Sequence, residues 1–310
     1  MADADVVVVG QVARDLVVVV DEVPEGGGSV PVRTRSEMLG GKGANQAVGL
    51  AQLGVRVALA GAVGEDAVAA DLLAQAKADG IDTSHVVRRA GATSALIIDI
   101  VDGSARWRYL EDIPDETLVT EADIDAARGA LSRARYVLVQ LQQPAATALH
   151  AATVTRAAGG RVVLDGVPQD RDACAGLLGT ADILRADAQE TDLLAGSHIG
   201  TPEAAVRLGR DVLGRGPSLV ALAVADQGNM FVWPDGELFL PLGDADVVDT
   251  TGAGDALVAA LTASLLRGEP PRNAARHAVE AAAATVGHPG GRPALSRRRS
   301  PGEKRADRLR

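Results

Sequence analysis

The stretch VDTTGAGDAL, residues 248–257, holds two glycines around an alanine, with an acidic residue on either side. An Ala-rich stretch with a helical pattern follows, so the small residues lie where a helix begins. The first N–H groups of a helix have no partner within it, and small residues let an oxyanion approach them closely. The stretch therefore predicts an anion site at a helix N-terminus, with the carboxylate of Asp255 beside it.

A second stretch, GGKGANQA at residues 40–47, has the same character. Either stretch alone would more often be a tight turn or a helix cap than a binding site. Neither is a Walker loop, and neither is a GxGxxG motif after a first strand. Only three of the 31 basic residues are lysines, and one of them, Lys42, lies inside GGKG. A bulky charged side chain is least expected there, so Lys42 is predicted to have a function.

The composition favours a layered α/β protein. Of the 310 residues 47% are hydrophobic but only 2% are aromatic, so the core must be built from Ala, Val, Leu and Ile. These residues suit buried parallel strands and closely packed helices. The net charge of −10 argues against a nucleic-acid binder, which needs a clustered basic face.

Strand and helix patterns alternate through most of the chain, which predicts a three-layer α/β/α fold around a mostly parallel sheet. Strands are expected at 6–9, 55–60, 136–140, 162–165, 183–185 and 219–224, with a hairpin over 230–240. Helices are expected at 43–53, 67–79, 145–158, 173–178, 190–195, 202–213, 256–266 and 273–285.

Several further strand-like runs do not fit this alternation. The run 16–20 follows the first strand after only six residues, which is too short for a crossover helix. Similar runs at 94–101 and 106–110 are separated by a turn-like Asp-Gly-Ser. A small separate sheet from about residues 12–39 and 94–111 is therefore expected.

GGKGANQA and DTTGAGDA, about 200 residues apart, together closely resemble motifs of the ribokinase-like, or phosphofructokinase B type, carbohydrate kinases. The resemblance runs from about Asp5 to Pro293. It implies a kinase domain over 1–295, in which the small sheet is a lid that covers the sugar. In this family the lid often makes the dimer interface, so a homodimer is expected.

The resemblance implies ATP-dependent phosphorylation of a primary hydroxyl of a sugar. Asp255 matches the general base, and the backbone N–H groups of four residues match the anion hole for the γ-phosphate: Gly252, Ala253, Gly254 and Asp255. We also expect the helix N-terminus to keep the Asp255 carboxylate ionised at neutral pH.

On the sugar side, four residues match positions that hold ring hydroxyls: Asp15, Gly41, Lys42 and Asn45. Taken alone, Asp15 could equally be a surface strand residue. Gln142 stands where ribokinases have a Glu that contacts ribose, and Ala13 replaces an Asn. The substrate is therefore expected to be ribose or a related pentose, hexose or nucleoside.

On the nucleotide side, Glu190 matches the acid that orients the water ligands of Mg²⁺, which enters with ATP. Asp187 replaces a neutral Asn, and Gly228 is what remains of a family loop at 223–228. Asp249 and Thr251 match positions linked to an activating K⁺, although Asp249 could instead cap the loop.

The altered nucleotide loop raises an alternative, a non-catalytic relative that binds sugar or nucleotide in a regulatory role. The complete GAGD favours the kinase, because a pure binder has no need of a base.

The remaining features indicate a cytoplasmic protein without membrane or nucleic-acid partners. Residues 296–310 carry seven basic and two acidic side chains and are expected to form a disordered tail. The single cysteine, Cys174, cannot form an internal disulfide. The first residues lack the basic start of a signal peptide, and no apolar run approaches the roughly 18 residues of a membrane span.

Overall fold

The computed structural model describes residues 3–104, 106–168, 170–243, 247–287 and 289–295. Its larger sheet has nine strands: β1 Val6–Val9, β4 Val57–Gly64, β5 Asp82–Arg89, β8 Tyr136–Gln140, β9 Arg161–Asp165, β10 Ile183–Ala186, β11 Leu219–Val224, β12 Gly228–Trp233 and β13 Gly236–Pro241. They lie in the order β13-β12-β11-β10-β9-β8-β1-β4-β5. All neighbouring strands are parallel except in the pairs β11–β12 and β12–β13, which are antiparallel, so β12 and β13 form a hairpin at one edge.

Helices cover both faces of this sheet. One face carries α1 Lys42–Gln52, α2 Ala67–Ala78, α8 Ala253–Leu266 and α9 Pro271–Thr285. The other carries α3 Glu121–Arg133, α4 Ala145–Ala157, α5 Arg171–Leu178 and α7 Pro202–Leu213. Val6 and Val8 of β1 pack into the hydrophobic core on the first face, and Val7 and Val9 pack into the core on the second face. A parallel strand buried on both faces needs an apolar residue at every position, which explains the VVVV run. The predicted three-layer fold is confirmed.

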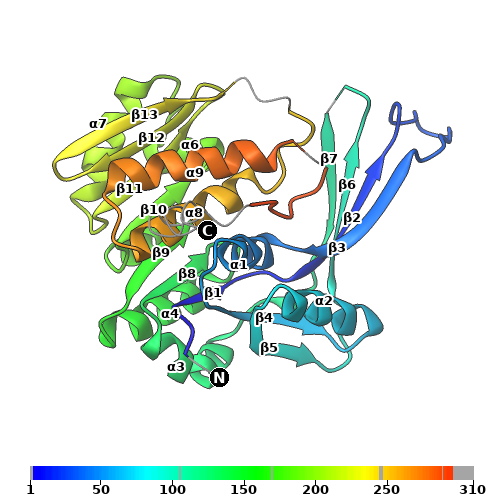
Figure 1. Cartoon of the computed structure of the whole chain (residues 1–310), viewed down its shortest axis with the longest axis horizontal. Coiled ribbons are helices and arrows are strands. Elements are labelled where there is room, and N and C mark those ends of the chain that lie inside the picture. The colour runs from blue at the N-terminus through cyan, green and yellow to red at the C-terminus, as the bar shows by residue number, and fades with distance from the viewer. Residues whose placement is uncertain (1–2, 105, 169, 244–246, 288, 296–310) are drawn as a thin grey trace, which may run out of the picture.

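A second sheet of four strands stands to one side of the main body (Figure 1). It contains β2 Ala13–Val19, β3 Thr34–Gly40, β6 Ala95–Val101 and β7 Trp107–Asp112 in the order β3-β2-β6-β7. The pairs β2–β3 and β6–β7 are antiparallel, and β2–β6 is parallel. The small sheet predicted from the sequence is therefore present, including the hairpin at 94–110.

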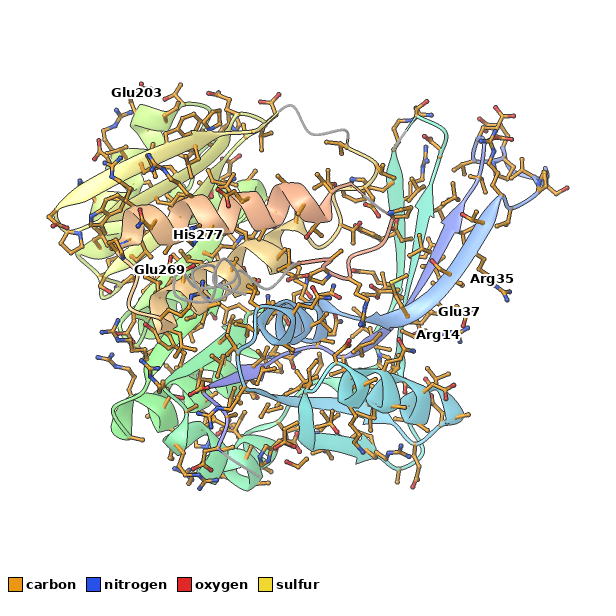
Figure 2. The ribbon with its side chains drawn as sticks, in the orientation of Figure 1. Arg14, Arg35, Glu37, Glu203, Glu269 and His277 are labelled. Atoms are coloured by element: carbon orange, nitrogen blue, oxygen red, sulfur yellow. The ribbon has the colours of Figure 1, made fainter. Side chains whose placement is uncertain are left out.

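Side chains alternate between the two faces of β2. Arg14 points outward and forms an ion pair with Glu37 of β3, near Arg35 (Figure 2). Asp15 points to the opposite face together with the buried Ala13 and Val17. Asp15 is 5% exposed, so it is not a surface strand residue.

Two elements of the main body were not predicted. These are β5 and α3, with the 3₁₀ turn η1 (Asp115–Thr117) just before α3. The basic tail at 296–310 lies outside the described residues, and the limits of the kinase domain at 1–295 stay a prediction. Within the described ranges, no helix combines the length and apolar character that a membrane span requires.

The order in which the strands are added to the larger sheet reverses at β1. The next strand of this sheet along the chain, β4, lies on one side of β1. After β5 the chain returns to the other side of β1, where β8 lies. In open α/β sheets, ligands bind outside the carboxyl ends of the strands at such a point. Gln140 and Asp165 end β8 and β9 at this edge, and Arg185 lies one residue before the end of β10.

Candidate active site

The GAGD stretch forms the start of α8, as predicted. Gly252 is the N-cap with φ 73°, and a Cβ there would lie 1.9 Å from the carbonyl oxygen of Gly291. Only glycine fits without moving one of these backbones. The N–H groups of Gly254 and Asp255 donate no hydrogen bond within the described part of the chain. These unpaired donors are what an anion site at a helix N-terminus requires.

Asp255 lies beneath this helix start and is 6% exposed. Asn45 Nδ2 donates to one carboxylate oxygen at 3.3 Å, and Gln46 Nε2 donates to the other at 3.0 Å. Both donors come from α1, so the two glycine-rich stretches meet at this carboxylate.

The pKa of Asp255 is raised to about 7. Burial is the largest cause and the charge of Asp165 adds to it, while Lys42, Gln46 and Arg185 act in the opposite direction. The expectation that the helix N-terminus keeps this carboxylate ionised is therefore wrong in direction, because loss of hydration outweighs the helix field. A group with this pKa is about half ionised at neutral pH.

Three residues that the sequence analysis missed extend the site. Gln46 Nε2 also donates to Asp165 Oδ2 at 2.7 Å, and Arg185 forms an ion pair with Asp165 Oδ1 at 3.0 Å. A continuous chain of contacts thus runs from Arg185 through Asp165 and Gln46 to Asp255. Two signals could have indicated it: the acidic residue that ends β9, and an arginine two positions before Asp187.

Lys42 begins α1 and contributes its charge to the same region. Burial lowers the pKa of Lys42, but the charges of Asp165, Asp255 and Glu190 together raise it by more, so the net shift is upward. Lys42 therefore stays protonated. The acidic charges that act on Lys42 are those of Asp165, Asp255 and Glu190, and its contact with a sugar stays a prediction.

Asp15 faces this site from the small sheet. Its carboxylate lies over Gly40, where a Cβ would be only 1.9 Å from Asp15 Cγ, and it accepts a hydrogen bond from the backbone of Gly41. Burial, reinforced by Asp255 and Asp249, raises the pKa of Asp15 to about 7. Asp15 Oδ1 and Asn45 Oδ1 are buried and lack a partner within the described ranges. Two unpaired buried acceptors suit a ligand that brings hydroxyl donors.

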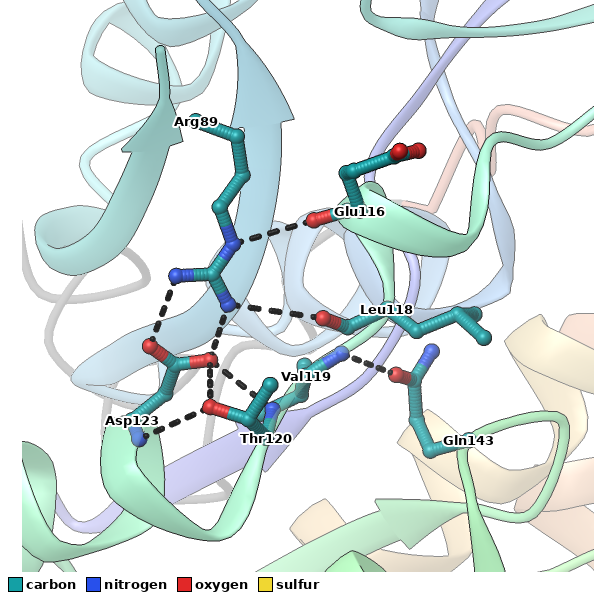
Figure 3. A network of polar contacts seen from close by, with 7 residues as sticks. All are labelled: Arg89, Glu116, Leu118, Val119, Thr120, Asp123 and Gln143. Atoms are coloured by element: carbon teal, nitrogen blue, oxygen red, sulfur yellow. Dashed lines mark hydrogen bonds and ion pairs between the residues drawn. The ribbon is translucent and has the colours of Figure 1, made fainter. Parts of the chain in front are cut away.

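Gln142 is exposed in the loop after β8, and no hydrogen bond among the described residues links it to this cluster. The loop itself is anchored by the next residue, since Gln143 Oε1 accepts the N–H of Val119 at 2.8 Å (Figure 3). Arg89 holds the segment before α3 by donating to the carbonyl oxygen of Glu116 and to Asp123. Gln142 is therefore available to a ligand but is not part of the network around Asp255.

The predicted nucleotide residues have structural partners. Asp187 is the N-cap of α6 (Ala188–Ala195) and forms a capping box with Glu190, with hydrogen bonds of 2.9 and 2.8 Å. Gly228 has φ 155° and starts β12, where a Cβ would meet the carbonyl oxygen of Leu240 at 2.2 Å. Contacts of these residues with a nucleotide stay a prediction.

Asp249 organises the loop before α8. It accepts hydrogen bonds from Thr251 N at 2.9 Å, Thr251 Oγ1 at 2.6 Å and Gly290 N at 2.7 Å. Two residues of the small sheet also contact Thr251: Asp99 at 3.3 Å, and Tyr109 through its hydroxyl. No group of three or more His, Cys, Asp or Glu side chains among the described residues is arranged to hold a metal ion.

Comparison with known proteins identifies the family. The model of the pfkB family carbohydrate kinases matches residues 3–298. The chain belongs to this family. Ribokinase of Bacillus subtilis is 28% identical over 294 residues, which cover 93% of this chain and 96% of that protein. Deoxyribokinase of Salmonella typhimurium is 25% identical over 254 residues, 82% of this chain and 83% of that one.

A solved structure agrees with these matches. The ribokinase of Arabidopsis thaliana in complex with ribose and ATP has a TM-score of 0.77 and 25% identity, and covers 93% of this chain and 94% of that one. The protein is therefore a carbohydrate kinase of the ribokinase type, as the two glycine-rich motifs indicate.

The buried carboxyls of this kinase predict an unusual pH dependence of stability. Asp15, Asp99 and Asp255 have a pKa of about 7 in the fold, raised from 3.8. Between these values the unfolded chain loses its protons first, so stability falls as the pH rises from about 4 to about 7. We expect the unfolding midpoint to be about 5 °C higher at pH 5.5 than at pH 7.5.

Calorimetry in the absence of ligands would measure this difference. Carboxyls with a lowered pKa, such as Asp66 and Asp123, change the stability only below about pH 4, so they do not affect the comparison between pH 5.5 and pH 7.5. The Asp15→Asn variant should show about two thirds of the wild-type shift, because Asp99 and Asp255 remain. A midpoint that rises with pH across this window would contradict the assignment.

Proposed function

We propose that this kinase transfers the γ-phosphate of ATP to a primary hydroxyl of ribose or a related pentose, hexose or nucleoside, with Asp255 as the general base. The observation that carries the proposal is a buried carboxyl with a pKa of about 7 beside unpaired N–H groups at a helix start. A general base works best when its pKa lies near the operating pH. No other described carboxyl combines these two properties.

The bond changes follow from this arrangement. The sugar oxygen forms a bond to the γ-phosphorus, and the bond from that phosphorus to the bridging oxygen breaks, with its electron pair leaving on ADP. The hydroxyl proton passes to Asp255. The N–H groups of Gly254 and Asp255, with the charge of Lys42, would stabilise the negative charge on the transferring group.

The sugar would lie between the small sheet and α1. The unpaired oxygens Asp15 Oδ1 and Asn45 Oδ1 would accept hydrogen bonds from its hydroxyl groups. A site built around such bonds rejects compounds that lack the matching hydroxyl, because its buried acceptors would stay unpaired. Ribose and deoxyribose are supported as candidates because ribokinases and deoxyribokinases are among the relatives.

The residues fit the cations that the family implies. Glu190 uses one carboxylate oxygen in the capping box, so the other would be available to a water ligand of Mg²⁺. When bound, Mg²⁺ would neutralise part of the negative charge of the phosphates. Asp99 Oδ1 is buried without a partner in the described chain, and with Asp249 and Thr251 it would hold K⁺ next to the anion site at the start of α8.

A homodimer through the small sheet is part of the proposal. Its edge strand β7 exposes Trp107 and Leu110, at 45% and 58%. Large exposed apolar side chains on an unpaired strand are typical of an interface.

The regulatory alternative is not favoured, since the Asp187 carboxylate is engaged at a helix cap.

A substrate panel tests the proposal. ADP release would be measured with ribose, deoxyribose, fructose and adenosine in the presence of ATP, Mg²⁺ and K⁺. At least one of these compounds should support turnover well above the rate without sugar. Absence of turnover across the whole panel would exclude this function.

The variant Asp15→Asn tests the sugar contacts separately. It keeps the shape of the side chain but replaces one acceptor by a donor, so a sugar hydroxyl loses its partner. We expect the KM for the sugar to rise by about 30-fold, while the KM for ATP stays within about twofold. The control Asp21→Asn removes an exposed carboxylate near the end of the same strand and should change neither constant.

A further inference from the structure

Arg185 lies against the start of α8 from the neighbouring strand β10. A Cβ built on Gly254 would lie 2.3 Å from Nη2, 2.7 Å from Cζ and 2.9 Å from Nη1 of this guanidinium. The guanidinium therefore covers the second residue of the helix, next to the N–H groups that donate no hydrogen bond. Its side chain is 12% exposed, so the charge is largely removed from water.

The donors of this guanidinium are only partly used. Nη1 donates to Asp165 Oδ1, and the second oxygen of Asp165 accepts a hydrogen bond from Gln46. Nη2, the nitrogen nearest to Gly254, makes no hydrogen bond within the ranges that the structure describes. A planar guanidinium offers five donors in a fixed fork and binds phosphate oxygens in two-bond geometry.

The charges around the site favour a second cation. A transferring phosphoryl group must approach a region that already holds Asp165, Asp255 and Glu190, whose charges all act on Lys42. One lysine cannot compensate these acids and the phosphate together. Among the described residues, Arg185 has its guanidinium next to Gly254, at the anion site at the start of α8.

We propose that Arg185 donates from Nη2 to the oxygens of the γ-phosphate, and that Asp165 holds the guanidinium in that position. This inference rests on the proposed phosphoryl transfer and adds a catalytic residue to it. Arg185 takes no part in the bond changes. It balances the charge that spreads over the γ-phosphate oxygens as the group passes from ATP to the sugar and ADP leaves.

The same chain of contacts gives Asp165 a positioning role. Its two oxygens join Arg185 to Gln46, and Gln46 donates to Asp255. Loss of the guanidinium alone would leave Asp165 as an uncompensated buried charge, which destabilises the fold and raises the pKa of Asp255 further. A test of Arg185 must therefore neutralise both partners.

The variant Arg185→Gln/Asp165→Asn removes both charges and keeps groups that can hydrogen-bond to each other. Titration calorimetry with a non-hydrolysable ATP analogue and with ADP, both without sugar, would isolate the contribution of the γ-phosphate. We expect the ratio of the two dissociation constants to shift by about tenfold against the ATP analogue. In the steady-state assay kcat should fall by about 100-fold.

The matched control is Arg156→Gln/Asp182→Asn, which neutralises a 3.0 Å ion pair at the opposite end of β10. It should leave the ratio and kcat unchanged. An unaltered ratio and kcat in a folded Arg185→Gln/Asp165→Asn variant would show a purely structural pair and overturn the inference alone. A wild-type protein that binds neither nucleotide would overturn the proposed function and this inference with it.

Discussion

The variant Asp255→Asn is expected to lower kcat by about 1,000-fold at pH 7.5. The amide has nearly the same shape as the carboxylate but cannot take the proton of the sugar hydroxyl. Binding depends on other groups, so the KM for ATP should stay within about threefold of the wild-type value. Steady-state ADP release at saturating sugar and ATP measures both constants.

The wild-type pH profile gives an independent check of the same role. With a pKa of about 7, Asp255 becomes protonated in mildly acidic solution, and kcat/KM should fall about tenfold per pH unit below that value. The matched control is Asp66→Asn, which changes a partly buried carboxylate that caps α2. Asn is as good an N-cap as Asp, so kcat should be retained, although stability falls because one of the two oxygens that accept from Ala69 and Ser94 is lost. A kcat for Asp255→Asn equal to that of the control would exclude Asp255 as the base.

The central elements could be predicted because their signals are local. The VVVV run of β1 is apolar at every position since both of its faces are covered. The glycines of both motifs mark helix starts in the sequence, and α1 and α8 begin within two residues of them. Six residues between two strand-like runs were enough to predict a separate small sheet, because no crossover fits.

The two missed elements have weaker signals. The edge strand β5, DTSHVVRR, pairs with β4 and has one exposed side, so it shows neither an apolar run nor a strict alternation. The helix α3 buries Ile124, Ala127 and Leu131, whose spacing suits one helix face. Acidic and arginine residues between them make the segment polar as a whole and conceal that pattern.

The site could be predicted only where it follows from a motif. Asp255 and Asn45 belong to motifs, and the structure joins them by a hydrogen bond. The contacts of Arg185 with Asp165 depend on two strands being neighbours, which no local pattern reveals. The direction of the Asp255 pKa shift was mistaken for the same reason, because burial is a property of the packed protein.

The second large effect is expected for Gly252→Ala. Gly252 has φ 73°, a left-handed conformation that costs a residue with a Cβ about 1–2 kcal/mol. Its Cβ would also lie 1.9 Å from the carbonyl oxygen of Gly291, so one of the two backbones must move. Either movement displaces the N–H groups that would surround the γ-phosphate. We expect kcat to fall by about 100- to 1,000-fold, since single donors of this kind contribute that much.

Gly268 provides a matched control for this variant. It follows the C-terminus of the same helix with φ 80°, and a Cβ there would meet nothing within 4 Å. Gly268→Ala should therefore lose a similar amount of stability through the left-handed conformation but keep its kcat. Thermal unfolding and steady-state kinetics on both variants separate strain from catalysis. If the two variants lost equal stability and both retained kcat, the loop around Gly252 would not be an anion hole.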